Sequence, residues 1–411
     1  MLISYKFKNF CSFSDEAEFD LLAPGNKVKH RFPDNYVETE AGYDLLKTAV
    51  VVGENAGGKT NFISSLSFFK SLFANNERVR TYKGLVNFNT LKEAGDRERY
   101  AVQEFDIQVM SKTGGIYHYH LAIDGYSIVK EMFSSQSAKS NQEKMIMSVT
   151  REELDTESKK GAVRAMYEVM LDNCSKEIEI VFERATITEE NLGLFVARLA
   201  ILGEPRAQEL VGWVNGRLNI ENQDFNYSIY KELQNTEEDI NIIRDPRFLD
   251  ILRMVDYSIE GIEIDEEKPF SASKIVRATK DGQRFSRELK RDSGGVREFF
   301  AWAVQLFRVV YEDKVVFADE MDRVINPILA ERMISFINGK KHRGQFIFSS
   351  HNVLHLDLKN YMKEQIYFVT KDRDSLNSEL YSLADFPDIR YETTKIYEFY
   401  MKGILGGTAF E

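Results

Sequence analysis

One segment, GENAGGKT at residues 53–60, limits the folds open to this chain more than any other. It fits the pattern G-x-x-x-x-G-K-[ST] and follows a short apolar run at Thr48–Val52, which is typical of a buried strand. After it, apolar residues recur at intervals of three or four, as on one face of a helix. These residues are Phe62, Leu66, Phe69 and Phe73. A glycine-rich loop between a strand and a helix surrounds phosphate oxygens with backbone N–H groups. The sequence therefore predicts an α/β fold with a phosphate-binding loop.

A second segment, KVVFADE at residues 314–320, ends an apolar strand pattern with two adjacent carboxylates. Ligands of parallel sheets bind at the carboxyl ends of the strands, so this pair is expected near the phosphate loop. In a nucleotide hydrolase, Asp319 would hold Mg²⁺ and Glu320 would accept a proton from the attacking water. Thr60 would be a second ligand of Mg²⁺, and Lys59 would contact the β- and γ-phosphates. The loop residues expected to bind ATP are Gly53, Asn55, Gly57, Gly58, Lys59, Thr60 and Asn61.

Two further signals follow the same logic. The run Ser293-Gly294-Gly295 opens another helical pattern. It could bind a phosphate group at that helix N-terminus, or the segment could be a simple N-cap, with Ser293 or Asp292 as the capping residue. His351 follows an apolar strand pattern at 346–348 and could contact both the γ-phosphate and the attacking water. A lone histidine is also common as a structural hydrogen-bond partner, so this assignment depends on its place in the order of the motifs.

The rest of the chain divides by pattern. Alternating apolar residues at 105–109 and 117–123, joined by turn residues, indicate an antiparallel hairpin. From about residue 134 the pattern becomes polar and helical, and from about residue 251 strand and helix patterns alternate, as in a mostly parallel sheet. The predicted organisation is the first part of an α/β head at 1–133, a helical insertion or lid at 134–250, and the second part of the head at 251–411.

Composition restricts the partners and the compartment. The 411 residues carry a net charge of −11, which argues against blanket wrapping of DNA. Two cysteines, Cys11 and Cys174, exclude a disulfide framework and fit a reducing compartment. No run approaches the ~18 apolar residues that a membrane span requires, so we expect a cytoplasmic protein without membrane contact. A basic cluster is explained either by a solvated hairpin or by a patch for nucleic acid or a partner. Its members are Lys274, Arg277, Lys280, Arg284, Arg287, Lys290 and Arg291.

The order of phosphate loop, SGG segment, DE pair and strand-end histidine resembles that of ABC-type ATPases. The similarity is closer to the RecF/SMC-like branch, which includes the AAA15 and OLD-type ATP-binding proteins of bacterial anti-phage (abortive infection, PARIS-like) systems. MLISYKFKNFCSF resembles the opening strand of that branch, DSGGVREFF its signature, and ADEMDRVINPIL its Walker B segment and D-loop. The resemblance covers both ends of the chain well and the middle loosely. It implies a P-loop NTPase of the α/β class, an ABC-type ATPase head with an antiparallel β subdomain and an inserted helical lid.

The resemblance also implies how the site is completed. In that family the signature of one subunit completes the ATP site of another, so the chain would form a homodimer or a higher homo-oligomer. The residues acting in trans would be Ser293, Gly294, Gly295 and Arg297. Asp322 would be the D-loop residue, and Gln103 and Glu131 are both candidates for the Q-loop position. Cys11 stands where relatives often carry an arginine that helps to hold the nucleotide.

The predicted function is therefore that of an ATPase, which converts ATP and water to ADP and phosphate with Mg²⁺. The resemblance implies a sensor or regulatory ATPase in bacterial antiviral defence, which switches its assembly state with ATP and controls a separately encoded effector protein. The alternative is a RecF-like DNA-binding ATPase in DNA repair or maintenance, so nucleic-acid binding stays open. A transporter ATPase is excluded, because in transporter subunits the phosphate loop and the signature segment are much closer in sequence than Lys59 and Ser293 are here.

Overall fold

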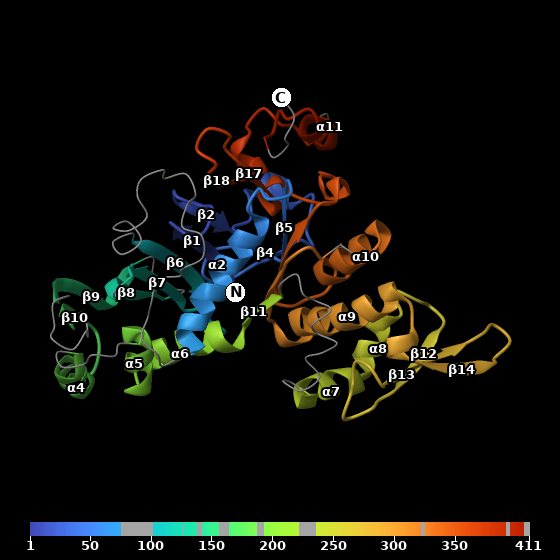
Figure 1. Ribbon diagram of the computed structural model, residues 1–411, viewed down its shortest axis with the longest axis horizontal. Coiled ribbons are helices and arrows are strands. Elements are labelled where there is room, and N and C mark those ends of the chain that lie inside the picture. Colours follow the sequence, from blue (N-terminus) through green and yellow to red (C-terminus); the bar gives the residue numbers. More distant parts are fainter. Residues whose placement is uncertain are drawn as a thin grey trace.

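The computed structural model describes residues 1–74, 102–125, 127–137, 142–155, 164–186, 193–221, 236–321, 325–391 and 395–406. Among these residues, the strands form a mostly parallel sheet of six strands, an antiparallel sheet of seven, and smaller sheets of three and two. In Figure 1 the parallel sheet lies in the middle, the antiparallel sheet on the left, and the helices α9 (Gly294–Glu312) and α10 (Pro327–Asn338) on the right. No described helix combines the length and the apolar character needed to cross a bilayer.

The parallel sheet carries the phosphate loop. Among the described strands its order is β11-β15-β16-β5-β17-β18, and all neighbours are parallel except β17 and β18. The strands are β5 (Thr48–Gly53), β11 (Leu218–Glu221), β15 (Val315–Ala318), β16 (Gln345–Ser350), β17 (Ile366–Lys371) and β18 (Ser378–Ser382). The predicted strands β5, β15 and β16 lie close together, so the segments that follow them meet at one edge of the sheet.

Both faces of the parallel sheet are covered by side chains. Along β5, Ala49 and Val51 pack toward the antiparallel sheet, whereas Val50 and Val52 pack in a second core with α9 and α10. The neighbouring strands alternate in the same way, because successive side chains of a strand point to opposite faces. A strand that is buried on both faces has a continuous apolar sequence, which explains why these strands were recognisable.

The antiparallel sheet has the order β10-β9-β8-β7-β6-β1-β2 among the described strands. Its strands are β1 (Leu2–Lys8), β2 (Ala17–Asp20), β6 (Gln103–Met110), β7 (Ile116–Ile123), β8 (Ile128–Gln136), β9 (Glu143–Asp155) and β10 (Arg164–Leu171). The expected hairpin is confirmed as β6 and β7. One face carries buried aromatics such as Tyr5 and Phe105, and the other carries polar groups such as Asp106 and His118, the usual pattern of a half-solvated sheet.

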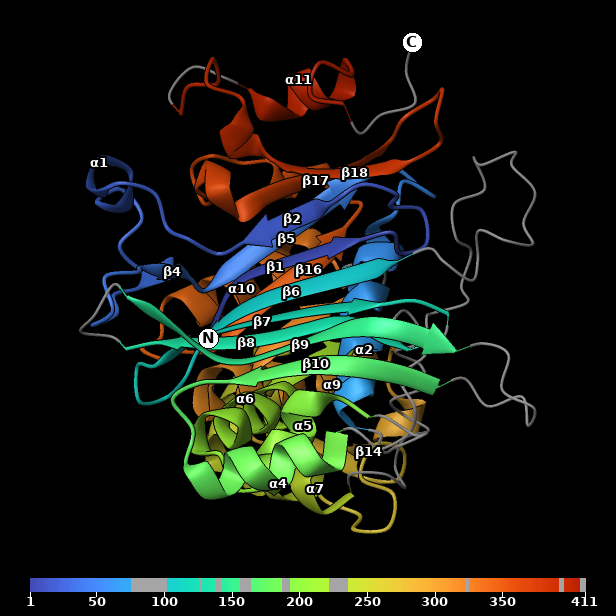
Figure 2. The same cartoon turned by 90° about the vertical axis from the view of Figure 1, so that its left-hand side faces the viewer.

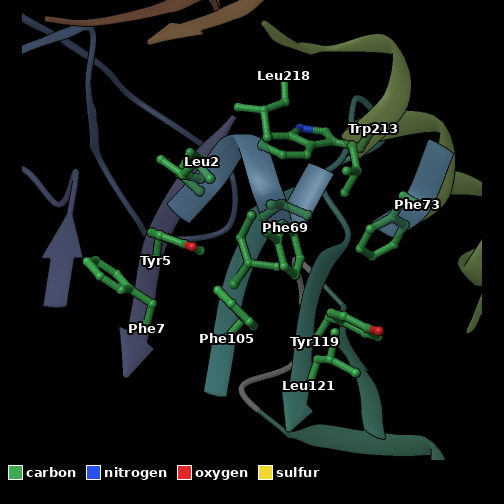
Figure 3. Close-up of a cluster of buried hydrophobic side chains, with 14 of the residues drawn as sticks. Leu2, Tyr5, Phe7, Phe69, Phe73, Phe105, Tyr119, Leu121, Trp213 and Leu218 are labelled. Carbon is green, nitrogen blue, oxygen red and sulfur yellow. The ribbon is translucent and has the colours of Figure 1, made fainter. Parts of the chain in front are cut away.

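Helix α2 (Lys59–Ala74) lies between the two large sheets. The ring of Phe62 contacts Phe317 of β15, with ring centroids 6.1 Å apart. Further along the helix, Phe69 packs against Tyr119 of β7, as Figure 3 shows. Full burial of one such side chain stabilises the fold by about 1.5–3 kcal/mol. The helix that begins at the phosphate loop is therefore fixed from both sides by buried rings.

On the opposite face of the parallel sheet, α9 is covered by a small α/β unit. Its elements are α7 (Thr236–Arg244), α8 (Pro246–Leu252), β12 (Ile259–Glu263), β13 (Lys274–Ala278) and β14 (Arg284–Glu288). Phe248 of α8 packs against Phe300 of α9, with ring centroids 5.2 Å apart. The β13–β14 hairpin lies at the outer edge of this unit, on the right of Figure 1.

Short elements complete the described chain. They are α1 (Asn26–Lys29), β3 (Tyr36–Val37), β4 (Leu45–Leu46), α11 (Ile396–Met401) and 3-10 helices at Leu289–Arg291, Val353–His355, Lys363–Gln365 and Leu383–Asp385. The long helices α9 and α10 and the strand β15 confirm the alternation predicted for the C-terminal part of the chain.

The helical insertion predicted for residues 134–250 is wrong in its first part and is not a separate unit. Strands β9 and β10 extend the antiparallel sheet, and β11 joins the parallel sheet. Helices follow them as α4 (Lys176–Thr186), α5 (Phe195–Ile201), α6 (Pro205–Gly216), α7 and α8, and the first three lie beside β10 in Figure 2. The sequence of β9 is rich in charged residues that favour helices, and pairing with β8 and β10 overrides that preference.

Candidate phosphate-binding and hydrolytic site

The phosphate loop turns sharply between β5 and α2. A Cβ atom on Gly53 would lie 2.2 Å from the carbonyl oxygen of Val369, and one on Gly57 would lie 3.1 Å from the same atom. Gly58 has φ +124°, a conformation that other residues rarely adopt, and a Cβ atom there would lie 2.5 Å from Ser378 Oγ. Strands β17 and β18 therefore press against the back of the loop, and this close packing requires glycine at these positions.

The loop borders a pocket of about 140 Å³ at the N-terminus of α2. The lining residues are Glu54, Asn55, Ala56, Gly58, Lys59, Thr60, Asn61, Glu320 and His351. The structure thus brings most of the predicted loop residues together with Glu320 and His351, whereas Gly53 and Gly57 contact β17 behind the loop. Pockets for whole ligands measure roughly 300–1,000 Å³, so this one is smaller than a site for a whole ligand.

Lys59 is buried at the first position of α2. Its Nζ atom donates hydrogen bonds to the carbonyl oxygens of Gly53 and Glu54, both at 2.8 Å. The same Nζ atom lies 3.5 Å from Nδ1 of His351. The ammonium group is therefore held at the loop by carbonyl oxygens that phosphate oxygens are able to replace as acceptors.

Strand β15 delivers Asp319 and Glu320 to the same edge. Asp319 is buried, and the hydroxyl of Ser349 donates to its Oδ1 atom at 2.6 Å. The same hydroxyl accepts a hydrogen bond from the backbone N–H of Glu320 at 2.7 Å. Ser349 thus fixes the positions of both acidic residues. Its place on β16, two residues before His351, is the signal that sequence reasoning missed.

The surroundings of the second carboxylate oxygen of Asp319 indicate whether a cation fits this site. Oδ2 is buried, and no described group forms a hydrogen bond with it. Leaving a buried carboxylate oxygen unpaired is costly, and a bound cation would remove that cost. Mg²⁺ prefers oxygen ligands, and Thr60 of the pocket would supply a hydroxyl oxygen. The residues present therefore fit the metal ion predicted from the sequence.

His351 lies between Lys59 and Glu320. Its Nε2 atom is 3.4 Å from Glu320 Oε1, and its Nδ1 atom faces the Lys59 ammonium group. In the tautomer that carries the ring proton on Nε2, Nδ1 is able to accept from the ammonium group and the Nε2–H is directed toward Glu320. Glu320 itself has φ +48°, a strained left-handed conformation of the kind that recurs at functional sites.

The signature segment lies apart from the pocket. Ser293 is the N-cap of α9, and its hydroxyl accepts a hydrogen bond from the backbone N–H of Val296 at 3.3 Å. Apart from its chain neighbours and the backbone of α9 itself, no described group lies within 4 Å of a Cβ atom built on Gly294 or Gly295. Among the described residues, neither these three nor Arg297 lines the phosphate pocket of the same chain. The N-cap role of Ser293 is confirmed, and its role in binding phosphate stays a prediction.

The remaining predicted positions are the D-loop residue and the two candidates for the Q-loop position. The D-loop residue Asp322 lies outside the described residues. Gln103 is buried on β6 and donates to the carbonyl oxygen of Asn9 at 2.8 Å. Glu131 is buried on β8 and accepts hydrogen bonds from the N-terminus of α5, including the N–H of Phe195 at 2.8 Å. Both Q-loop candidates therefore support the antiparallel sheet and its neighbours instead of the phosphate pocket.

No family model matches the chain, and no curated protein matches it. Among the solved structures similar to this chain are SMC head domains. One is an SMC head bound to the C-winged helix domain of ScpA, with a TM-score of 0.49 and 11% identity over 93% of this chain and 97% of that chain. The SMC head domain from Thermotoga maritima has a TM-score of 0.44 and 13% identity, over 93% and 98% of the two chains. An SMC head with an extended coiled coil, bound to the C-terminal domain of ScpA derived from Pyrococcus furiosus, has a TM-score of 0.38 and 11% identity, over 93% and 96%.

Proposed function

We propose that this protein hydrolyses ATP to ADP and phosphate at the pocket around Lys59. The observation that carries the proposal is the convergence of three strand ends, with the phosphate loop after β5, Glu320 after β15 and His351 after β16. Asp319 precedes Glu320 and does not itself line the pocket, but its unpaired buried oxygen supports a cation at the same edge of the sheet. Phosphate binding, charge neutralisation and a base for water are thus available at one edge of the sheet.

The residues of the chain would divide the chemistry between them. The loop N–H groups would bind phosphate oxygens, and Lys59 would exchange its carbonyl contacts for phosphate contacts. Glu320 would accept a proton from the attacking water, while the Nε2–H of His351 orients its carboxylate. Mg²⁺, held by Asp319 and Thr60, would neutralise charge on the β- and γ-phosphates.

The open N-terminus of α9 supports an assembly in which two chains share a site. Within one chain, Gly294 and Gly295 leave free space above the first turn of the helix, and the segment does not reach the phosphate pocket. A helix N-terminus attracts anions through its backbone N–H groups. We therefore propose a homodimer or a higher homo-oligomer, in which Ser293, Gly294, Gly295 and Arg297 complete the pocket of another subunit.

A regulatory role follows from the sequence resemblance to AAA15 and OLD-type ATPases. In this proposal the protein is a cytoplasmic sensor of a bacterial anti-phage system, and ATP-dependent assembly controls a separately encoded effector protein. ATP-dependent closure supplies the two states that such a switch needs, because contacts to the γ-phosphate exist before hydrolysis and vanish after it.

The alternative, a RecF-like DNA-binding ATPase, has weaker support from the basic cluster between Lys274 and Arg291. Five of the seven basic side chains in this described segment form ion pairs with nearby carboxylates. These are Lys274 with Glu263, Arg277 with Asp256 and Asp292, Arg284 with Glu260, and both Lys290 and Arg291 with Glu288. The pairs lower the positive potential that a phosphate backbone requires. The structure thus favours the solvated hairpin as the explanation of this cluster.

The proposed activity is tested with Glu320→Gln, Lys59→Ala and the control Glu331→Gln, which changes an exposed glutamate on α10. Glu320→Gln is expected to lower kcat about 100-fold or more, because a general base contributes 10²–10⁴, and to retain ATP binding. Lys59→Ala is expected to lose ATP binding, and the control to behave as wild type. Phosphate release and ATP titration measure these effects, and normal turnover by Glu320→Gln would contradict the proposal.

The proposed role is tested by purifying tagged Glu320→Gln from its host with and without Mg-ATP. A stoichiometric protein that is present with ATP and lost without it would support a sensor that holds an effector. Nuclease-sensitive DNA or RNA without a protein partner would instead support the DNA-binding alternative.

A further inference from the structure

A row of hydrogen-bonded polar side chains, contributed by both ends of the sequence, lies behind the phosphate loop. Ser378, at the start of β18, is buried, and its hydroxyl donates to the carbonyl oxygen of Gly57 at 2.6 Å. The hydroxyl oxygens of Ser378 and Ser12 are 2.7 Å apart, and Asn61 Nδ2 donates to Ser12 Oγ at 2.7 Å. Because a hydroxyl group has one proton, Ser378 donates to Gly57 and accepts from Ser12. The hydrogen bonds therefore run in one direction, from Asn61 to Gly57.

The last of these hydrogen bonds fixes the orientation of one peptide group. The described chain has no cis peptide bonds, and in a trans peptide the carbonyl oxygen of Gly57 and the N–H of Gly58 point in opposite directions. Ser378 holds the carbonyl oxygen at the back of the loop, and Gly58 lines the pocket at the front. The N–H of Gly58 is thereby turned toward the pocket. The absence of a side chain at Gly58 also makes room for Ser378, since a Cβ atom there would lie 2.5 Å from Ser378 Oγ.

We infer that Ser378 is a positioning residue for phosphate binding, which holds the Gly58 N–H toward the pocket through the Gly57 carbonyl group, and that Ser12 holds Ser378 in turn. The inference rests on the proposed function, because the N–H donor matters when a nucleotide phosphate enters the pocket. Such a donor binds the phosphate equally before and during the reaction. Its loss therefore raises KM and leaves kcat unchanged.

The test compares Ser378→Ala with Ser382→Ala, which removes a buried hydroxyl from the other end of the same strand. The Ser382 hydroxyl donates to the carbonyl oxygen of Lys363 and accepts from the N–H of Ala384, both away from the phosphate loop. Ser378→Ala is expected to raise both the Kd and the KM for ATP about tenfold, equivalent to ~1.4 kcal/mol, with kcat unchanged. Ser382→Ala is expected to match wild type in all three constants. A general loosening of β18 would instead affect both variants alike.

The possible results separate the inference from the proposed function. An unchanged Kd in folded Ser378→Ala overturns the inference, as does an equal rise in Ser382→Ala. If Ser378→Ala does not fold, Ser12→Ala removes the preceding hydrogen bond, and we expect its Kd to rise about threefold, equivalent to ~0.6 kcal/mol. An unchanged Kd in Ser12→Ala then overturns the inference. Wild-type protein that binds no ATP overturns the proposed function and the inference together.

Discussion

Glu320 is held in place by its backbone as well as by its side chain. Its N–H donates to Ser349, whose hydroxyl in turn donates to Asp319, so one serine sets the positions of two acidic residues. The left-handed φ of +48° at Glu320 costs roughly 1–2 kcal/mol for a residue with a Cβ atom. The proposed base therefore occupies a conformation that local preference disfavours and the neighbouring strands enforce.

This backbone strain predicts that two variants at position 320 differ in stability in the opposite order to the usual one. We expect Glu320→Gly to be more stable than Glu320→Ala by about 1 kcal/mol, because glycine adopts positive φ without steric cost. The matched control is the same pair at Glu331 in α10, where glycine is expected to be less stable than alanine by about 0.5–1 kcal/mol. Urea unfolding measures all four variants. An alanine variant as stable as the glycine variant at position 320 would show that the backbone there is unstrained.

Among the secondary elements, β8 and α5 are joined by a buried acid. Glu131 accepts hydrogen bonds from the N–H groups of Phe195 and Val196, which caps the helix. Burial disfavours the charged carboxylate and raises the pKa of Glu131 to about 7, from an ordinary value of 4.5. The folded state therefore binds the Glu131 proton more tightly than the unfolded state does.

The raised pKa of Glu131 predicts a loss of stability with rising pH. Its contribution to the free energy of unfolding is fully present below pH 4.5 and decreases by up to about 3 kcal/mol as the pH rises toward 7. Glu131→Gln removes the titrating group, so its free energy of unfolding should decline less between these pH values. Urea unfolding at several pH values tests this, with Glu168→Gln on the exposed side of β10 as a control that keeps the wild-type slope. Parallel curves for Glu131→Gln and wild type would refute the prediction.

The hairpin of β13 and β14 supports the start of α9 through a buried ion pair. Arg277 donates to Asp256 at 2.8 Å and lies 2.7 Å from Asp292, next to Ser293. The side chains of Arg277 and Asp292 are 8% and 5% exposed, so the pair is nearly dry. A buried charge that loses its partner is strongly destabilising.

Arg277→Ala is therefore expected to lower the free energy of unfolding by about 3–5 kcal/mol. Arg284→Ala, in the same hairpin, removes an exposed arginine paired with Glu260 and is expected to cost less than about 1 kcal/mol. Chemical unfolding of both variants measures the difference. Equal losses would mean that burial of the Arg277 pair has no energetic consequence.

At the scale of the whole molecule, distant parts of the chain meet around the phosphate loop. The turn after β1 supplies Ser12, the hairpin of β17 and β18 supplies Ser378, and both lie behind Gly57. The signature segment at the start of α9 stays apart from this site within one chain. Residues from both ends of the chain thus support the phosphate loop from behind, whereas the N-terminus of α9 does not reach the pocket of its own chain.

An active site shared between subunits predicts complementation between two inactive variants. Lys59→Ala lacks the phosphate contact, and Gly295→Asp places a carboxylate where the signature would meet phosphate. Each variant alone should be inactive, whereas an equal mixture of exchanging dimers should recover roughly a quarter of the wild-type activity, because half of the dimers contain one intact site. Phosphate release after mixing measures the recovery. No recovery from subunits that are shown to exchange would place the signature in the same chain as its pocket.

The sequence alone determined the central elements of this protein. Strands β5, β15 and β16 were predictable because burial on both faces demands continuous apolar residues. The phosphate loop and the DE pair were predictable because their chemistry requires particular residues at a fixed spacing. Helix α2 was recognisable because its phenylalanines recur at helical spacing. They lie on one face of the helix, which fills the space between the two sheets.

The tertiary structure alone decided which distant residues support these motifs. Ser378 and Ser12 carry no local signal, because a hydroxyl becomes specific when another strand brings its partner within hydrogen-bond distance. The same holds for β9, which pairing with β8 and β10 turned into a strand against the preference of its charged sequence. Local sequence thus sets which elements each segment is able to form. Contacts between remote segments supply most of the free energy that stabilises the fold, so they select the arrangement that the chain adopts.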